Sequence, residues 1–570
     1  MRSRTLLAGC ATITAIVAVT AVVAQTSTAT TTNPATSAGT DRPAPAADQA
    51  PGSGQMAAPS DAGKPLELAN VQESVDYLKR TYLISTAEAL RRLELQRISP
   101  ALAERLKREF PDSYGGMWLD QDHGGVVVIA GTNTKAIGAA LADQPDRAHI
   151  RVRQVRHSLR QLDAAAHRIA ARLRIYSGGP VDVGVNPTTN GVDVLTRGKP
   201  STALAVRIDR ATAGETVPAR LRPQKIMKTE SKLGMIGAGS TTAPPAITAV
   251  TARLAAATRT ATAPGTVARA AAAGPGTALI AYGNSWCAPL ACDPPLRGGV
   301  RLDIQRDGNP APGTPPYSWG GCTNGFNVRG SNGWVYTLTA GHCVLNENHD
   351  DAGWTDYSSH NGLQVGIEPG GSSSTRLSVL SDALALDYAL MPYDTRGINW
   401  SAYWITNRID WNRVAKFTGC WLDSQSTRPG FTCSYATQWM TGYYDKAAIG
   451  LNWVVCFAGT ATDNYYWTGS SWAGSTGAPS GWVPGLRCGE VENLPTIGAS
   501  WLLASVCTAK GDSGGPLFSQ VDGKAYGILH DGPPATGNGV CAGPSQEFTY
   551  LSEIFKNART RSGGVTFSVN

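Results

Sequence analysis

Cysteine is almost absent from the first half of this 570-residue sequence, where Cys10 is the one cysteine before Cys287. A disulfide framework is therefore excluded for that half. The whole chain contains no Cys-x-x-Cys pair and only eight histidines, which argues against a structural zinc site. Beyond residues 5–24, no other stretch is apolar enough to span a membrane. We expect no metal, no cofactor and no membrane association once that first stretch is removed.

The N-terminal stretch has the pattern of an export signal. Residues 1–4 are basic, residues 5–24 are apolar or small, and Val22-Val23-Ala24 predicts a cleavage site, so 1–24 is expected to be a signal peptide. An uncleaved membrane anchor is the alternative. Residues 25–65 are rich in Thr, Ala, Pro and Ser and predict a disordered leader. We therefore expect a secreted, extracellular protein.

Residues 66–205 show the patterns of a small α+β unit. Ser85-Thr86-Ala87-Glu88 has the spacing of a capping box and predicts the start of a helix, while residues 101–110 predict a second, short helix. Apolar runs around an Asp/His/Gly turn predict a hairpin over residues 116–130. Residues 206–277 are rich in Ala and Thr without periodicity, and we predict a linker there that contains an activation cleavage site.

Residues 278–570 differ from the rest in composition. They are rich in Trp, Tyr, Gly and Cys, with short apolar runs between turn residues, which is typical of an all-β domain. They contain 17 Lys and Arg against 22 Asp and Glu, a net charge of −5, whereas the whole chain has +7. The basic charge therefore belongs to the first half and does not indicate nucleic-acid binding by residues 278–570.

A serine lies between glycines late in the chain, in Lys510-Gly511-Asp512-Ser513-Gly514-Gly515-Pro516. A catalytic serine needs a tight turn, a nearby base and backbone N–H groups that face the developing oxyanion. The run also fits the Gly-x-Ser-x-Gly pattern of α/β-hydrolases. Upstream lie Thr339-Ala340-Gly341-His342-Cys343 and Leu386-Asp387-Tyr388. The order His, Asp, Ser is that of the chymotrypsin template, whereas an α/β-hydrolase places its histidine last.

On these motifs the sequence resembles the chymotrypsin-fold (S1 family) serine peptidases. It is more similar to the bacterial streptogrisin and α-lytic protease branch, because Cys507 precedes the serine by six residues. The resemblance implies a trypsin-like, all-β catalytic domain of two six-stranded antiparallel barrels, at about residues 296–395 and 412–550. Residues 66–205 resemble the α+β pro-region of the α-lytic group, and an independent small binding domain is the alternative.

The resemblance also implies the catalytic roles. Ser513 would be the nucleophile, His342 the general base, and Asp387 the residue that orients the histidine. Asp382 and Asp394 compete with Asp387 for the last role. The apolar neighbours of Asp387 favour it, because a buried carboxylate can hold an imidazole N–H.

Further assignments concern the oxyanion and the substrate pocket. The backbone N–H groups of Gly511 and Ser513 would form the oxyanion hole, and Asp512 is predicted to be paired inside the second barrel. Because Cys507 stands where trypsin-like members have an aspartate, we predict cleavage after neutral, apolar side chains. A one-residue slip would put His530 where glutamate-specific members have histidine, so cleavage after Glu is the alternative. The predicted pocket residues are Thr508, Leu529, His530 and Asp531.

The ten cysteines after residue 286 predict five disulfides. Family-like contexts imply Cys322–Cys343, Cys456–Cys488 and Cys507–Cys541, and elimination leaves Cys287–Cys292 and Cys420–Cys433. Between Cys456 and Cys488, the aromatic-rich residues 463–482 predict an exposed surface that contacts an extended substrate or a polymer.

Together these features predict a secreted serine endopeptidase made as a pre-pro-enzyme. We expect it to act on polypeptides as a monomer, with its own pro-region as its binding partner. The alternative is a catalytically inactive secreted homologue that acts as a binding protein.

Overall fold

The computed structural model describes residues 65–175, 181–197, 199–224, 287–289, 291–292, 295–305, 319–344, 358–360, 363–366, 380–381, 386–392, 409–422, 431–460, 464–467, 472–475, 485–493, 496–498, 500–532 and 546–570. The predicted signal peptide, almost all of the predicted leader and residues 225–277 of the predicted linker lie outside these ranges. No helix within them is long and apolar enough to cross a membrane.

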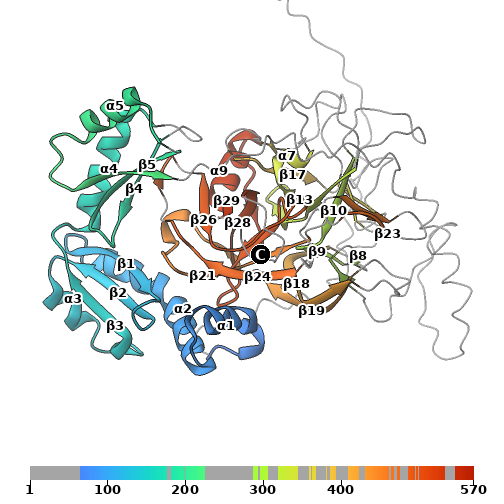
Figure 1. The fold of residues 1–570 in the computed structure, drawn as a ribbon, viewed down its shortest axis with the longest axis horizontal. Coiled ribbons are helices and arrows are strands. Elements are labelled where there is room, and N and C mark those ends of the chain that lie inside the picture. Colours follow the sequence, from blue (N-terminus) through green and yellow to red (C-terminus); the bar gives the residue numbers. More distant parts are fainter. Residues whose placement is uncertain are drawn as a thin grey trace, which may run out of the picture. The chain divides into compact units, whose positions relative to one another are not determined.

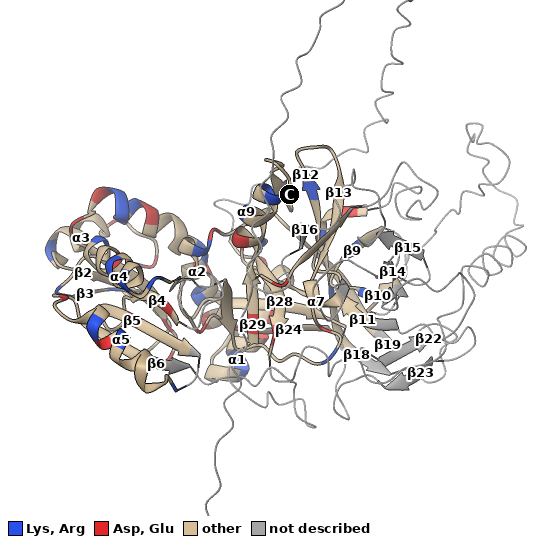
Figure 2. Ribbon diagram, turned by 90° about the horizontal axis from the view of Figure 1, so that it is seen from above, with Lys and Arg blue, Asp and Glu red and all other residues tan. Residues whose placement is uncertain are grey.

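Two small sheets with covering helices make up residues 65–224 (Figure 1). Their strand orders are β1-β2-β3 and β25-β4-β5-β6, where β25 comes from the C-terminal half. Figure 2 shows acidic and basic positions interspersed along the helices. The bounds are α1 Leu68–Tyr82, α2 Thr86–Glu109, β1 Tyr114–Asp120, β2 Val126–Gly131, α3 Thr134–Ala140, β3 Ile150–Gln154, α4 Leu159–Leu173, β4 Val181–Asn186, β5 Gly191–Arg197, α5 Thr202–Thr212 and β6 Ala219–Gln224.

The local patterns of this part correctly predicted one helix start and one hairpin, and made two errors. Ser85 caps α2, because its hydroxyl accepts the N–H of Glu88 at 3.2 Å, and β1 pairs with β2 as the predicted hairpin. The separate helix over 101–110 is wrong, because α2 continues through Pro100 to Glu109 as one helix with buried residues on both sides of the proline. The boundary at residue 205 is also wrong, because α5 crosses it and β6 pairs with β5, so ordered structure continues to Gln224.

Residues 287–570 form mainly antiparallel sheets. The larger strand orders are β11-β10-β14-β15, β16-β17-β13-β12-β30, β19-β18-β9 and β24-β21-β27-β28-β29-β26, with β20 beside β28. The bounds are β7 Cys287–Ala288, β8 Ala291–Cys292, β9 Leu296–Gly298, β10 Arg301–Gln305, β11 Trp319–Thr323, β12 Phe326–Gly330, β13 Val335–Thr339, α7 Gly341–Val344, β14 Ser358–His360, β15 Leu363–Gly366, β16 Leu380–Ser381, β17 Ala389–Pro392, β18 Ile409–Leu422, β19 Phe431–Trp439, β20 Gly442–Tyr443, β21 Val454–Gly459, β22 Asn464–Trp467, β23 Trp472–Ser475, β24 Gly485–Glu490, β25 Thr496–Ile497, β26 Trp501–Ala504, β27 Pro516–Phe518, β28 Lys524–Asp531, β29 Gln546–Tyr550, α9 Leu551–Arg561 and β30 Phe567–Ser568.

Two strand pairings cross the predicted division between the barrels. Strand β9 pairs in parallel with β18, which lies mostly in the range predicted for the second barrel. Strand β30, near the end of the chain, pairs with β12 in the range predicted for the first barrel. In the sheet next to Ser513, β24 and β26 are the two ends of the strand order. A single bridge between Val491, just after β24, and Ala504, in β26, connects these two ends. Two complete six-stranded barrels remain a prediction.

The disulfide framework largely follows the predicted pairing. Four pairs are confirmed: Cys287–Cys292, Cys322–Cys343, Cys420–Cys433 and Cys456–Cys488. Cys507 is disulfide-bonded, and its predicted partner, Cys541, lies outside the described residues. In the aromatic-rich segment, β22 and β23 form a hairpin, and its side chains lie outside the described part.

Helices α1 and α2 pack against the sheet that contains β21. The side-chain amide of Gln96 on α2 bonds both backbone groups of Val454: it accepts the N–H at 2.7 Å and donates to the carbonyl at 2.9 Å. On α1, the backbone N–H and hydroxyl of Ser74 donate to Oε1 of Gln520 at 2.9 and 2.7 Å. Apolar residues of the two helices share buried clusters with the sheet. The N-terminal helices thus complete the core of the C-terminal half.

A buried carboxylate lies within this contact. The hydroxyl of Tyr82, at the end of α1, donates to Glu490 at 2.9 and 3.0 Å from its two carboxylate oxygens. Burial raises the pKa of Glu490 to about 7, although the hydrogen bond from Tyr82 acts in the opposite direction. Burial therefore favours the protonated form of Glu490, because it outweighs the effect of this hydrogen bond.

This raised pKa predicts a pH-dependent contact. Stability from neutral Glu490 is fully present below its usual pKa of 4.5 and is lost as the pH rises through about 7. Hydrogen exchange over residues 68–82, corrected for intrinsic rates, should show decreasing protection between about pH 4 and pH 8. Glu490→Gln should remove the dependence, whereas Glu492→Gln, at an exposed neighbour, should keep it. An unchanged slope in Glu490→Gln would contradict this account.

Candidate active site

The carboxylate of Asp387 is the centre of the site. It is completely buried, just before β17. Its Oδ1 accepts the backbone N–H of His342 at 2.7 Å, and its Oδ2 accepts from Nδ1 of His342, also at 2.7 Å. Two bonds from one residue fix both the position of the imidazole and the ring nitrogen that carries the proton.

Burial alone would raise the pKa of Asp387. The charges and hydrogen bonds of His342 and of a second histidine, His530, outweigh this effect and hold the pKa well below its usual value. Asp387 also has a φ of 47°, in the left-handed region that few non-glycine residues occupy. Such a conformation persists where surrounding contacts fix it, and it is enriched at functional sites.

The other ring nitrogen of His342 is free to act. Nε2 is buried and has no hydrogen-bond partner among the described residues. With Nδ1–H bonded to Asp387, the neutral ring has its lone pair at Nε2, which is the atom a general base uses.

The turn around Ser513 is held against the strands that lead to His342. The carbonyl of Ser513 accepts the N–H of Thr323 at 2.8 Å, and Thr323 follows Cys322, the disulfide partner of Cys343. Gly514 has a φ of 82°, and a Cβ there would lie 2.6 Å from the amide nitrogen of Ala340. Glycine is therefore required both by the turn and by this close approach.

Backbone N–H groups of the turn divide into two sets. Those of Asp512, Gly514 and Gly515 donate to backbone carbonyls. Among the backbone hydrogen bonds of the described residues outside helices and strands, none is donated by Gly511 or Ser513. These are the two amides predicted to face the oxyanion.

Asp512 is paired inside the sheet, as predicted, and its partner is Arg487. Nη1 of Arg487, on β24, lies 2.9 Å from Oδ2 of Asp512, which also accepts the N–H of Ala509 at 2.8 Å. Asp512 is completely buried. No motif in the sequence pointed to Arg487, because an arginine beside a cysteine is not a recognisable pattern.

The residues predicted to line the substrate pocket all lie in the described part of the chain. Leu529 packs in the buried core, and the hydroxyl of Thr508 donates to Oε1 of Gln546 at 2.6 Å. Each of these two side chains is 4% exposed. Oδ1 of Asp531 accepts the N–H of Gly532, and His530 bonds Asp387 rather than lining a pocket.

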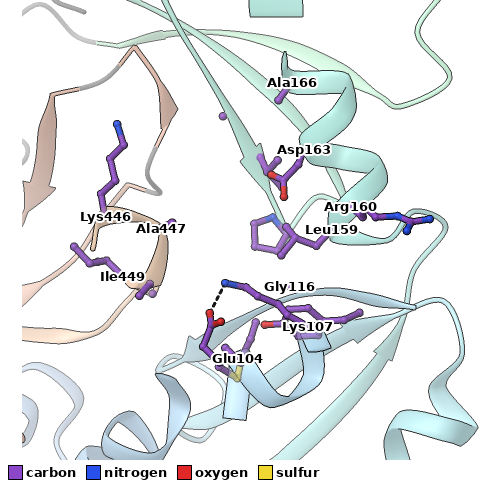
Figure 3. A pocket seen from close by; sticks show the side chains of 18 of the residues that line it. Glu104, Lys107, Gly116, Leu159, Arg160, Asp163, Ala166, Lys446, Ala447 and Ile449 are labelled. Carbon is purple, nitrogen blue, oxygen red and sulfur yellow. Dashed lines mark hydrogen bonds and ion pairs between the residues drawn. The ribbon is translucent and has the colours of Figure 1, made fainter. Parts of the chain in front are cut away.

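A cavity of about 790 Å³ lies away from this site (Figure 3). It is lined by α2, α4 and residues 446–450, and the Glu104–Lys107 ion pair of 2.7 Å lies at its edge. None of the predicted catalytic residues lines it. In the part of the chain that the structure describes, no group of His, Cys, Asp or Glu is arranged to hold a metal ion.

Comparison with known proteins gives weak likenesses. No protein-family model matches the chain, and no curated protein matches it. Among solved structures, Nocardiopsis protease (NAPase) is 15% identical and aligns over 48% of this chain and 97% of its own, at a TM-score of 0.24. Cellulomonas bogoriensis chymotrypsin is 19% identical and aligns over 47% of this chain and 96% of its own, at a TM-score of 0.23. Neither likeness is strong enough to decide fold or function, so the residues of the site have to do so.

The Arg487–Asp512 pair predicts that loss of the arginine lowers the stability of the fold. Arg487→Met leaves a buried carboxylate without its cation, which typically costs about 3–5 kcal/mol of unfolding free energy. Urea unfolding should show this loss, and Arg329→Met, at an exposed arginine, should change stability by less than about 0.5 kcal/mol. Restoring stability with Arg487→Met/Asp512→Asn would identify the unpaired charge as the cause. Equal stability of Arg487→Met and the unsubstituted protein would contradict the pairing role.

Proposed function

We propose that this chain is a serine endopeptidase that uses Ser513, His342 and Asp387. The observation that supports this most is the buried Asp387 carboxylate, bonded to both the backbone and Nδ1 of His342, while Nε2 has no partner among the described residues. A histidine that only stabilised the fold would be expected to have both ring nitrogens satisfied when buried.

In the proposed reaction, Oγ of Ser513 attacks the scissile carbonyl while Nε2 of His342 takes its proton. The tetrahedral intermediate collapses when His342 gives that proton to the leaving amine, and water then hydrolyses the acyl-enzyme by the same route. Asp387 stays ionised and stabilises the imidazolium. The N–H groups of Gly511 and Ser513 bind the oxyanion, and the reaction requires no cofactor.

The proposal includes export and maturation. Four disulfides in the C-terminal half are compatible with an exported protein. Residues 65–224 act as a pro-region that assists folding and then inhibits, until cleavage between about residues 225 and 277 releases a monomeric enzyme. Cleavage after apolar side chains stays part of the proposal.

Covalent labelling tests the nucleophile. A serine-directed fluorophosphonate should label the matured protein at Ser513, as mapped by mass spectrometry, and Ser513→Ala should not label. Asp387→Asn should lower kcat on peptides by about 10⁴, because the imidazole is then held in the wrong tautomer. Absence of label at Ser513 in a folded, matured protein would favour the alternative of an inactive binding protein.

The pro-region role has its own test. Without residues 65–224, the backbone groups of Val454 and the apolar residues beneath α1 and α2 lose their partners. Residues 278–570 expressed alone should give little activity, and a separate chain of residues 1–277 should rescue it.

Gln96→Ala in the separate chain should weaken the rescue, whereas Arg108→Ala, on the same helix, should not. Equal active yields with and without the N-terminal part would refute the folding role.

A further inference from the structure

His530 makes a contact that its expected place in a substrate pocket does not explain. Its Nδ1 lies 2.7 Å from Oδ2 of Asp387, and the same oxygen accepts from Nδ1 of His342. Asp387 is ionised, because its pKa lies well below the usual value, so the histidine must be the donor. Two imidazoles, one from each half of residues 287–570, therefore bind one carboxylate.

The backbone orients His530 toward Asp387. Leu529 is paired with Phe548 on β29, but the next pair is Asp531 with Glu547, so β28 has one extra residue at this point. A bulge of this kind redirects a side chain, and bulges are enriched beside active sites. The two neighbours of His530 are thus paired in the sheet, while His530 is directed at the carboxylate.

The ring of His530 is also stacked on the ring of Trp501. The rings of Trp501 and His530 lie 5.3 Å apart between centroids, with only 5° between their planes. His530 is 8% exposed. The ring therefore has little freedom to leave Asp387, and packing on one face is combined with hydrogen bonding at its edge.

We propose that His530 is a positioning residue for the triad, an inference that rests on the proposed function. Its N–H fixes Asp387 so that Oδ2 faces Nδ1 of His342, and it draws part of the carboxylate's charge away from that imidazole. His342 is then held in alignment, and the negative charge that acts on its ring is smaller than that of an otherwise free carboxylate. The titratable groups near His530 are Asp387, His342, the adjacent Asp531, and Glu547 on the neighbouring strand.

Two substitutions separate hydrogen bonding from packing. His530→Phe keeps a flat ring on Trp501 but removes the donor, whereas His530→Asn keeps an N–H donor near the position of Nδ1 but removes the stack. If the hydrogen bond is what matters, His530→Phe should lower kcat roughly 10- to 100-fold with little change in KM, because a hydrogen bond to a charged group is lost. His530→Asn should recover most of this loss.

The pH profile provides a readout that packing would not move. Without the donor, more of the charge of Asp387 acts on His342, so the acid limb of kcat/KM should move to higher pH in His530→Phe. In His530→Asn it should stay near that of the unsubstituted enzyme. An active His530→Phe with an unchanged acid limb, or a larger loss in His530→Asn than in His530→Phe, would overturn the proposal.

A measurement without catalysis separates this inference from the proposed function. In Ser513→Ala protein with labelled histidines, NMR should show the titration midpoint of His342 moving upward in His530→Phe and staying in place in His530→Asn. Identical midpoints in all three proteins would refute the role of His530. Should the unsubstituted chain neither label nor hydrolyse peptides, the proposed function fails, and the NMR comparison still decides the contact.

Discussion

The carboxylate of Asp387 is buried away from water, and hydrogen bonds from two distant parts of the chain replace its hydration. A buried ion is tolerated when its oxygens are fully bonded, and here three donors meet two oxygens. Two of the donors belong to His342 and one to His530, 188 residues later on β28. The charge can be accommodated only if both regions fold and meet, so the site and the tertiary structure depend on one another.

A second buried charge holds the serine turn. Asp512 bonds Arg487 across the sheet and the N–H of Ala509 within the turn, while Gly514 lets the turn touch the strand before His342. The serine is therefore fixed by its neighbours and not by its own side chain. The backbone carbonyl of Ser513, which accepts the N–H of Thr323, adds a further contact to the turn.

The N-terminal part contacts the C-terminal half. Gln96 satisfies an amide and a carbonyl of β21, and β25 extends the β4-β5-β6 sheet by backbone pairing with β4. These contacts resemble the way an extended peptide binds to a sheet edge, where main-chain hydrogen bonds supply the attachment.

The sequence by itself determined the local and ordered features: the cap at Ser85, the hairpin from β1 to β2, and the order of His342, Asp387 and Ser513. Such features depend on near neighbours or on residue type, which a linear pattern records. Only the tertiary structure decided that Arg487 pairs with Asp512, that β9 and β30 join sheets far from their neighbours in sequence, and that Leu529 packs in the core. It also decided that His530 reaches Asp387, because a single extra residue in β28 reverses which side chain faces the site, and a hydrogen bond between residues 143 positions apart leaves no mark in the sequence.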